Sequence, residues 1–303
     1  MRVLAAVLVA GAASGVLFGT TLQGTVLLAY FAQLPLFIVG LSHGWTAAAA
    51  AGIAGSASAM AVGGFGLAAA FAVMEAVPVV LLCWRALRHR ARPDGSIEWY
   101  GSGGLATEAT LATAIVAAVQ TVMMVQLAGG PDAVMSRIEP MIGAMGGSID
   151  ESMRAFIGAI IRILPGIAAA SWFWMLVVNG ALGQWIAKRS GSAWRPSPQM
   201  AELEMPRWVS ELFAICAIGS LFSGFAGLLG ENLVVALLGA FALAGFAIVH
   251  AAAAKVGNRL MLAATYLVVV VFGFPLLLLA IAGVLEPWLR LRARFLSGAA
   301  PRA

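Results

Sequence analysis

Residues 45–84 read WTAAAAAGIAGSASAMAVGGFGLAAAFAVMEAVPVVLLCW, and Glu75 is the one formally charged residue among them. The apolar run extends back to Val3 without another formal charge. A water-soluble core does not bury such a run, whereas apolar blocks of about 18 or more residues are typical of helices that cross a membrane. The stretch therefore predicts that hydrocarbon surrounds much of the folded chain.

The composition of the whole chain predicts the same class of protein. Of its 303 residues, 62% are hydrophobic and 10% are charged, and the mean hydropathy is +0.96. Lipid offers the backbone no hydrogen-bond partner, so spanning segments form helices or closed barrels, and these blocks lack the ~10-residue alternation of barrel strands. We therefore predict an all-α, polytopic transmembrane bundle of about eight or nine helices with one amphipathic surface helix. The bundle forms a single integral membrane domain over residues 1–303.

The apolar blocks and the basic residues between them predict a topology. The predicted spans are residues 3–19, 26–41, 45–62, 65–84, 107–127, 157–186, 208–229, 233–254 and 260–284. Arginine and lysine gather in the loops 85–106 and 187–207, which the positive-inside rule places in the cytoplasm together with the N-terminus. The formal charge of +5 therefore indicates membrane topology, and no nucleic-acid partner is expected.

The C-terminal part of the chain leaves two alternatives open. Counting spans places Lys255 on the cytoplasmic face, but one further crossing places the basic tail 287–303 outside. Either one late segment does not cross the membrane, or the arginine-rich end lies at the outer interface.

The segment 129–156 has a different pattern from the spans. Apolar residues recur there every three or four positions, from Met135 to Phe156, and charged residues occupy the other face. This periodicity predicts an amphipathic helical segment on the external surface, either as a simple connector or as a lid on the bundle. Ser148 and Glu151 have the spacing of a capping box, which predicts a new helix start.

Glu75 is the first candidate for chemistry, because a carboxylate inside a span costs about 2.5–3.5 kcal/mol on insertion scales. Pro78 follows it and frees a backbone carbonyl one turn upstream, so the two residues predict a polar notch for a proton or a cationic ligand. The structural alternative is a protonated carboxyl that hydrogen-bonds a neighbouring helix. Gln120, Asn179 and Asn232 complete the set of candidate ligand or proton contacts.

Gly11, Gly15 and Gly19 form a small-xxx-small face on the first predicted span. Such a face allows another helix backbone to approach closely. We expect it to serve helix packing, either inside the bundle or against a partner subunit.

Several enzyme signatures are missing from the sequence. It contains no G-x-x-x-x-G-K-[ST] phosphate loop, no H-E-x-x-H metal motif and no recognisable hydrolase pairing of Ser with His. The sequence has three His and two Cys, and both Cys83 and Cys216 lie inside apolar blocks. Candidate metal ligands are therefore few. We therefore expect no catalytic residue, no metal and no cofactor.

Short motifs at both ends of the chain resemble the YybS-like family, a group of bacterial multi-pass membrane proteins of uncharacterised activity. They are Asn179 in a Trp-rich span, Arg195-Pro-Ser-Pro198, Pro206-Arg-Trp208, Asn232, Gly245-Phe-Ala-Ile-Val-His250, Tyr266, Pro287-Trp288 with Arg292, and LPLFIVGLSHG from Leu34. That family is distantly similar to the substrate-binding subunits of energy-coupling-factor transporters and to MreD-like shape-determining proteins. The resemblance implies a helical bundle in a bacterial inner membrane, with a small-molecule site or with other membrane subunits as partners.

Two functions follow as hypotheses. The first is a transporter or transporter-like binding subunit for an unknown small molecule, with Glu75, Gln120 and Asn179 around an interior site. The second is a membrane scaffold without a ligand, which would use the glycine face and the basic loops to bind another membrane protein.

Overall fold

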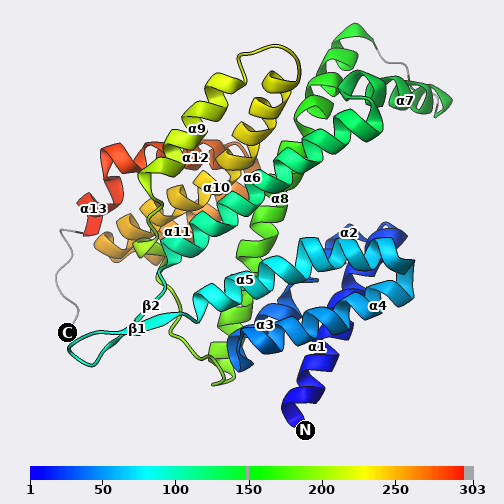
Figure 1. The fold of residues 1–303 in the computed structure, drawn as a ribbon. Coiled ribbons are helices and arrows are strands. Elements are labelled where there is room, and N and C mark those ends of the chain that lie inside the picture. The colour runs from blue at the N-terminus through cyan, green and yellow to red at the C-terminus, as the bar shows by residue number, and fades with distance from the viewer. Residues whose placement is uncertain (146, 148–149, 297–303) are drawn as a thin grey trace. The chain divides into compact units, whose positions relative to one another are not determined.

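The computed structural model describes residues 1–145, 147 and 150–296. The fold is an all-α membrane bundle (Figure 1), and among these residues the strands are limited to one hairpin of β1 (His89–Ala91) and β2 (Ile97–Trp99). The helices form two compact units. The first comprises Met1–Ala109 and Trp174–Leu203, and the second comprises Thr110–Phe173 and the described part of Glu204–Ala303.

Among the described residues, five helices are long and apolar enough to cross a membrane, or six if one sharply bent pair counts as a single span. This number is smaller than the predicted eight or nine. The difference arises in three of the predicted spans, where a helix breaks, stops early or bends, and at one hairpin whose two arms are counted together as a single helix.

The first unit contains most of the N-terminal helices. Its elements are α1 (Arg2–Gly19), η1 (Thr20–Gln23), α2 (Val26–Ala29), α3 (Leu34–His43), α4 (Trp45–Phe71), the π-helix η2 (Ala72–Ala76), α5 (Val77–Ala86) and η3 (Met200–Glu202), with parts of α6 (Ser102–Ala128) and α8 (Glu151–Arg189). Arg85 at the end of α5 forms an ion pair with Glu108 of α6, with 2.7 Å between Nε and Oε1.

The continuous helical segment Trp45–Ala86 is a hairpin of two arms. A Cβ on Gly52 would lie 2.9 Å from the Cβ of Ala76, although a straight helix would hold these residues about 36 Å apart. The chain reverses at Gly63 and at Gly64, whose φ of 76° favours glycine. Figure 1 shows the returning arm, which ends in α5, beside α4. The reversal lies where the predicted spans 45–62 and 65–84 meet, so each arm of the hairpin corresponds to one predicted span.

The predicted span 26–41 is wrong as a single helix, because it breaks into α2 and α3. Between them the backbone makes tight i→i−3 hydrogen bonds, from Phe31 N–H to Leu28 O (3.1 Å) and from Leu34 N–H to Phe31 O (3.1 Å). Pro35 lies in the first turn of α3, where its fixed φ and missing N–H favour a helix start. Hydropathy alone does not detect this break, since the residues on both sides of it are apolar.

The second unit contains the remaining helices. They are α7 (Pro131–Ala144), α9 (Arg207–Gly219), α10 (Gly224–Val256), α11 (Arg259–Phe272), α12 (Pro275–Leu289) and α13 (Leu291–Leu296), with parts of α6 and α8. The predicted span 208–229 is wrong at its C-terminal end, because α9 stops at Gly219 and α10 already begins at Gly224. A Cβ on Gly230 would lie 2.4 Å from the backbone N of Ser220. Only glycine therefore permits this close reversal.

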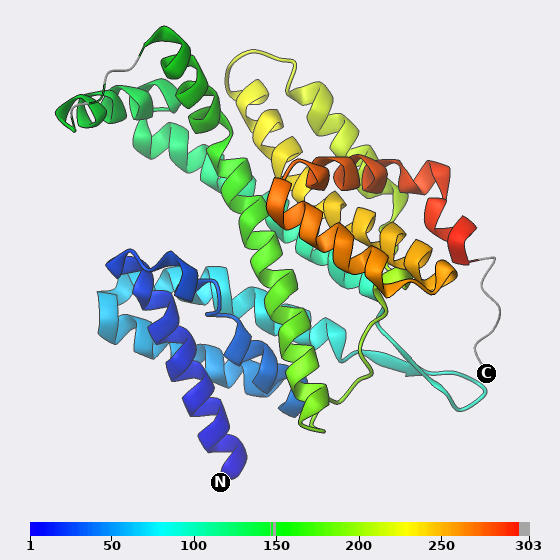
Figure 2. The same cartoon turned by 180° about the vertical axis from the view of Figure 1, so that it is seen from behind.

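The predicted span 260–284 is also wrong as one straight helix. It consists of α11 and α12, which are bent by 119° at the residues between them. Gly273 has a φ of 69°, and Pro275 begins α12, so glycine freedom and a proline start meet at the corner. Figure 2 shows α12, in dark orange to red, turning back from the end of α11.

The amphipathic segment 129–156 contains α7 and the first turns of α8. Some of its apolar side chains are exposed, such as Met145 at 87% and Phe156 at 63%, whereas Met135 is buried at 6%. The start of α8 is capped by Asp150, whose Oδ1 accepts the N–H of Met153 at 2.7 Å. Ser148 of the predicted capping box lies outside the described residues, as do residues 297–303 of the basic tail.

Candidate functional site

Glu75 lies in the one-turn π-helix η2, inside the returning arm of the helical hairpin. Its side chain is 3% exposed, and no ion pair reaches it from the part of the chain that the structure describes. Val77 N–H bonds Ala72 O across the widened turn. Pro78, which lacks an N–H, follows directly, and π-turns of this kind are frequent at functional sites.

Gln33 lies beside the Glu75 carboxyl. It is 0% exposed and ends the break between α2 and α3. Within the described residues, both polar atoms of its amide and Oε2 of Glu75 lack a hydrogen-bond partner. Buried polar atoms are rarely left in this state, and each such case calls for an explanation. In the sequence, Gln33 is one polar residue within a predicted span, and hydropathy alone does not single it out.

Asn179 of α8 contacts the same break from another side. Its Nδ2 donates to Tyr30 O at 2.6 Å and to Met175 O at 2.8 Å, while its buried Oδ1 has no partner among the described residues. Asn179 thus holds a backbone carbonyl that the interrupted helix leaves available. The break therefore connects Asn179 to the Gln33 and Glu75 pair.

Ser14 of α1 belongs to the same polar level of the first unit. It is 0% exposed, and its Oγ has no partner within the described part of the chain. The rings of Phe18 and Phe71 touch edge to face, with 5.7 Å between centroids. Ser14 lies one helical turn from Phe18 on α1, and Glu75 lies one helical turn from Phe71 on the arm that runs antiparallel to α1. The register thus predicts that both lie at the same depth.

The glycines of α1 pack against α4 in the first unit. A Cβ on Gly11 would lie 2.3 Å from Ala51 O, and one on Gly15 would lie 2.2 Å from Gly55 O. A Cβ on Gly19 would lie 2.8 Å from the side chain of Val62. The glycine face therefore allows two backbones to touch within the unit, and it is covered by α4.

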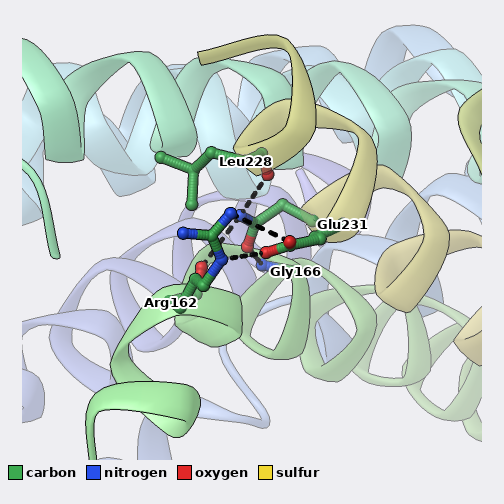
Figure 3. Close-up of polar contacts among 5 residues, drawn as sticks. Arg162, Gly166, Leu228 and Glu231 are labelled. Atoms are coloured by element: carbon green, nitrogen blue, oxygen red, sulfur yellow. Dashed lines mark hydrogen bonds and ion pairs between the residues drawn. The ribbon is translucent and has the colours of Figure 1, made fainter. Parts of the chain in front are cut away.

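Asn232 makes a different arrangement, in the second unit. Figure 3 shows its neighbourhood, where α8 and α10 meet. Its Oδ1 accepts Gly166 N–H at 2.7 Å, and its Nδ2 donates to Arg162 O at 3.0 Å and to Leu228 O at 2.8 Å. An unbroken helix pairs Gly166 N–H with Arg162 O. The Asn232 amide thus bridges these two groups beside Pro165.

This bridge uses both N–H donors and the carbonyl oxygen of a side chain that is 0% exposed. Next to it, Arg162 forms a two-armed ion pair with Glu231, at 2.5 Å from Nε to Oε2 and 2.9 Å from Nη2 to Oε1. The sequence did not predict that pairing, since the two residues lie far apart in the chain. We interpret Asn232 as a helix clamp.

Gln120 lies on α6 in the second unit, and its buried Oε1 has no partner among the residues described. The same unit holds a small-residue core of Ala117, Ala169 and Ala236. Gln120 and Asn232 therefore belong to one unit, and Glu75 and Asn179 to the other. The role of each as a ligand contact stays a prediction.

Cys83 and Cys216 are buried free thiols. Within residues 1–145, 147 and 150–296, no group of three His, Cys, Asp or Glu side chains is arranged to hold a metal ion. Glu75, Gln33, Asn179 and Ser14, the polar residues described above in the first unit, contribute one carboxyl, two amides and one hydroxyl.

Comparison with known proteins gives one family. No curated protein and no solved structure matches the chain. A family model described as "Predicted membrane protein (DUF2232)" matches residues 3–285, which include every helix from α3 to α11. The chain belongs to this family of predicted membrane proteins.

Proposed function

We propose that this protein is a transporter-like, small-molecule-binding protein of a bacterial cytoplasmic membrane, and that Glu75 is its proton-responsive group. The proposal rests on the environment of the Glu75 carboxyl. Glu75 is 3% exposed inside a span, it has no cationic partner among the described residues, and it lies on a π-turn. Intramembrane carboxyls in such settings mark proton relays and ligand sites.

The surrounding residues support a change of state at this carboxyl. The neutral form needs no counter-ion at this depth. When Glu75 loses its proton, the Gln33 amide beside it can turn an N–H toward the new charge. Gln33 lies on the break between α2 and α3, so a change at Glu75 can reach a segment that is not held by regular helical bonds. Discontinuous helices serve this purpose in many transporters.

The motif resemblance to YybS-like proteins, a family distantly similar to energy-coupling-factor binding subunits, also supports a small-molecule site. The positive-inside rule supports a cytoplasmic N-terminus, because Arg88, Arg90 and Arg92 lie in the loop that follows the four predicted spans 3–19, 26–41, 45–62 and 65–84. Other membrane subunits remain candidate partners under this proposal.

Native mass spectrometry of the protein released from detergent micelles tests the proposal. The spectra are recorded at about pH 5 and at about pH 8, one value on each side of neutrality. We expect a bound small molecule on the wild-type protein, with occupancy that differs between the two pH values. The variant Glu75→Gln is expected to lose this pH response. Glu211→Gln, which alters an exposed glutamate of α9, is the matched control and should behave as wild type.

Two results would overturn the proposal. One is a folded, inserted wild-type protein that carries no small molecule at either pH. The other is a Glu75→Gln variant that keeps the wild-type pH response. Circular dichroism of each sample verifies that the helices are intact.

A further inference from the structure

Basic side chains gather at one end of the second unit. There α10 ends, α11 begins, and α13 folds back so that Lys255 Nζ donates to Arg294 O at 3.3 Å. The ammonium group of Lys255 also lies 5.9 Å from the ring centroid of Phe295. Figure 2 shows α13, in red, beside this end of α10 and α11. Three helix ends therefore bring their cations to one place.

Only part of this positive charge is balanced by carboxylates. Arg292 is held by Glu204 and lies 4.0 Å from Glu286, and Arg207 pairs with Glu211 at 3.1 Å. In contrast, Lys255, Arg259 and Arg290 form no ion pair with any described residue. All three are exposed.

The corner that carries Arg290 has a defined backbone conformation. Arg290 has a φ of 50° and is the one non-glycine residue with positive φ among those described, a conformation that costs most L-residues energy. The corner after α12 is fixed by Glu286, whose two carboxylate oxygens accept the N–H groups of Leu291 and Arg292 at 2.9 Å each. Like charges held close repel one another, so an anion between them relieves a cost that the fold imposes.

The side chains next to these cations are apolar and exposed. Val256 is 70% exposed, Leu260 75% and Leu289 40%, and each is the direct chain neighbour of one of the unpaired cations. Trp288 is 45% exposed and lies under the guanidinium of Arg207 at 5.6 Å. Exposed tryptophan is typical of the membrane–water interface. A soluble anion needs no such hydrocarbon surface, whereas a phospholipid does.

We propose that Lys255, Arg259 and Arg290 bind the phosphate headgroup of an anionic phospholipid. Its acyl chains lie against the exposed apolar residues that neighbour these cations. Each cation near a membrane surface contributes about a fivefold gain in affinity for anionic lipid. This site is independent of Glu75 and of any transport activity.

Lipid titration of the detergent-solubilised full-length protein, read by native mass spectrometry, tests this site. We expect phosphatidylglycerol to bind the wild type at least about tenfold more tightly than zwitterionic phosphatidylcholine. The triple variant Lys255→Gln/Arg259→Gln/Arg290→Gln should bind phosphatidylglycerol about a hundredfold more weakly than wild type. The single variant Arg259→Gln, at the exposed start of α11, should lose about fivefold and guards against misfolding of the triple variant.

The matched control is Arg88→Gln/Arg90→Gln/Arg92→Gln, which removes the same formal charge from the β-hairpin of the first unit. If this control weakens binding as much as the site variant does, the effect is general electrostatics and the proposal fails. Equal binding of the zwitterionic lipid also overturns it. If inorganic phosphate or glycerol phosphate competes fully with the lipid, the site binds a free anion and the proposal of a lipid site fails.

Discussion

Replacement of Asn232 tests whether its side-chain amide clamps α8 to α10. Asn232→Ala removes three hydrogen bonds, of 2.7, 2.8 and 3.0 Å. Interhelical side-chain hydrogen bonds in membranes are worth about 0.6 kcal/mol each on average and up to about 1.7 kcal/mol. Two of the three bonds cross to α8 and the third, to Leu228 O, lies within α10, so the variant should lose about 1 kcal/mol of unfolding free energy, and at most about 3 kcal/mol.

The neighbouring residue provides the comparison. Glu231 pairs with Arg162, but the two side chains are 27% and 44% exposed, and pairs of this kind contribute about 0–1 kcal/mol. We expect Glu231→Gln to cost less than Asn232→Ala, although an ion pair is the more conspicuous contact. Reversible unfolding with SDS in mixed micelles, followed by circular dichroism, measures both changes.

Asn232→Asp separates hydrogen bonding from packing. Aspartate has nearly the same shape, but it loses the two N–H donors and turns carboxylate oxygens toward the carbonyls of Arg162 and Leu228. Asp should therefore be more destabilising than Ala. An Asp variant as stable as wild type, or an Ala variant within about 0.5 kcal/mol of wild type, would refute the clamp.

Three further predictions follow from the packing, the hairpin and the topology. Gly15→Ala places a methyl group against a carbonyl of α4 at 2.2 Å and should lower the SDS midpoint, whereas Gly158→Ala meets nothing within 4 Å and should leave it unchanged or raise it. Hydrogen bonds from Arg90 and Arg92 lower the pKa of Glu98 from 4.5 to about 2, so the hairpin keeps this stabilisation above pH 4.5 and loses it as the pH falls through about 2. Pepsin cleavage within the hairpin should then increase at the acid end of that window, and Glu98→Gln should remove the pH dependence. Reporter domains fused to the C-terminus and inserted between α10 and α11 should lie on the same side of the membrane, and opposite sides would contradict the bend between α11 and α12.

The sequence predicted the class of fold and the main buried acid, because both depend on composition. Glu75 stands out as a lone charge in a long apolar run, and the reversal at Gly63 and Gly64 follows from two adjacent glycines between apolar blocks. Gln33 was harder to identify as its neighbour. The break that positions Gln33 lies in continuous apolar sequence, and Pro35 was the one local signal for it.

The Asn232 clamp shows why other contacts were not predictable. Periodicity and hydropathy describe one helix at a time, whereas the clamp depends on Pro165 of α8 and an amide of α10 meeting at the same level. The sequence marked Asn232 as a polar residue at the start of a span, which fits a ligand contact as well as a helix contact. The register between α8 and α10 decides between these alternatives. A single sequence does not show which residues of two helices lie at the same level.

The bend between α11 and α12 bears on the two alternatives that the basic tail left open. α11 has 14 residues and rises about 21 Å, which is less than the ~30 Å hydrocarbon core. α12 then turns by 119°, and the contact of Lys255 with Arg294 shows that the chain comes back to the end from which α11 left. A segment that enters and leaves at the same end does not change sides. We therefore predict that the arginines after α12 lie on the side of the membrane that holds Lys255, which is the arrangement in which one late segment fails to cross.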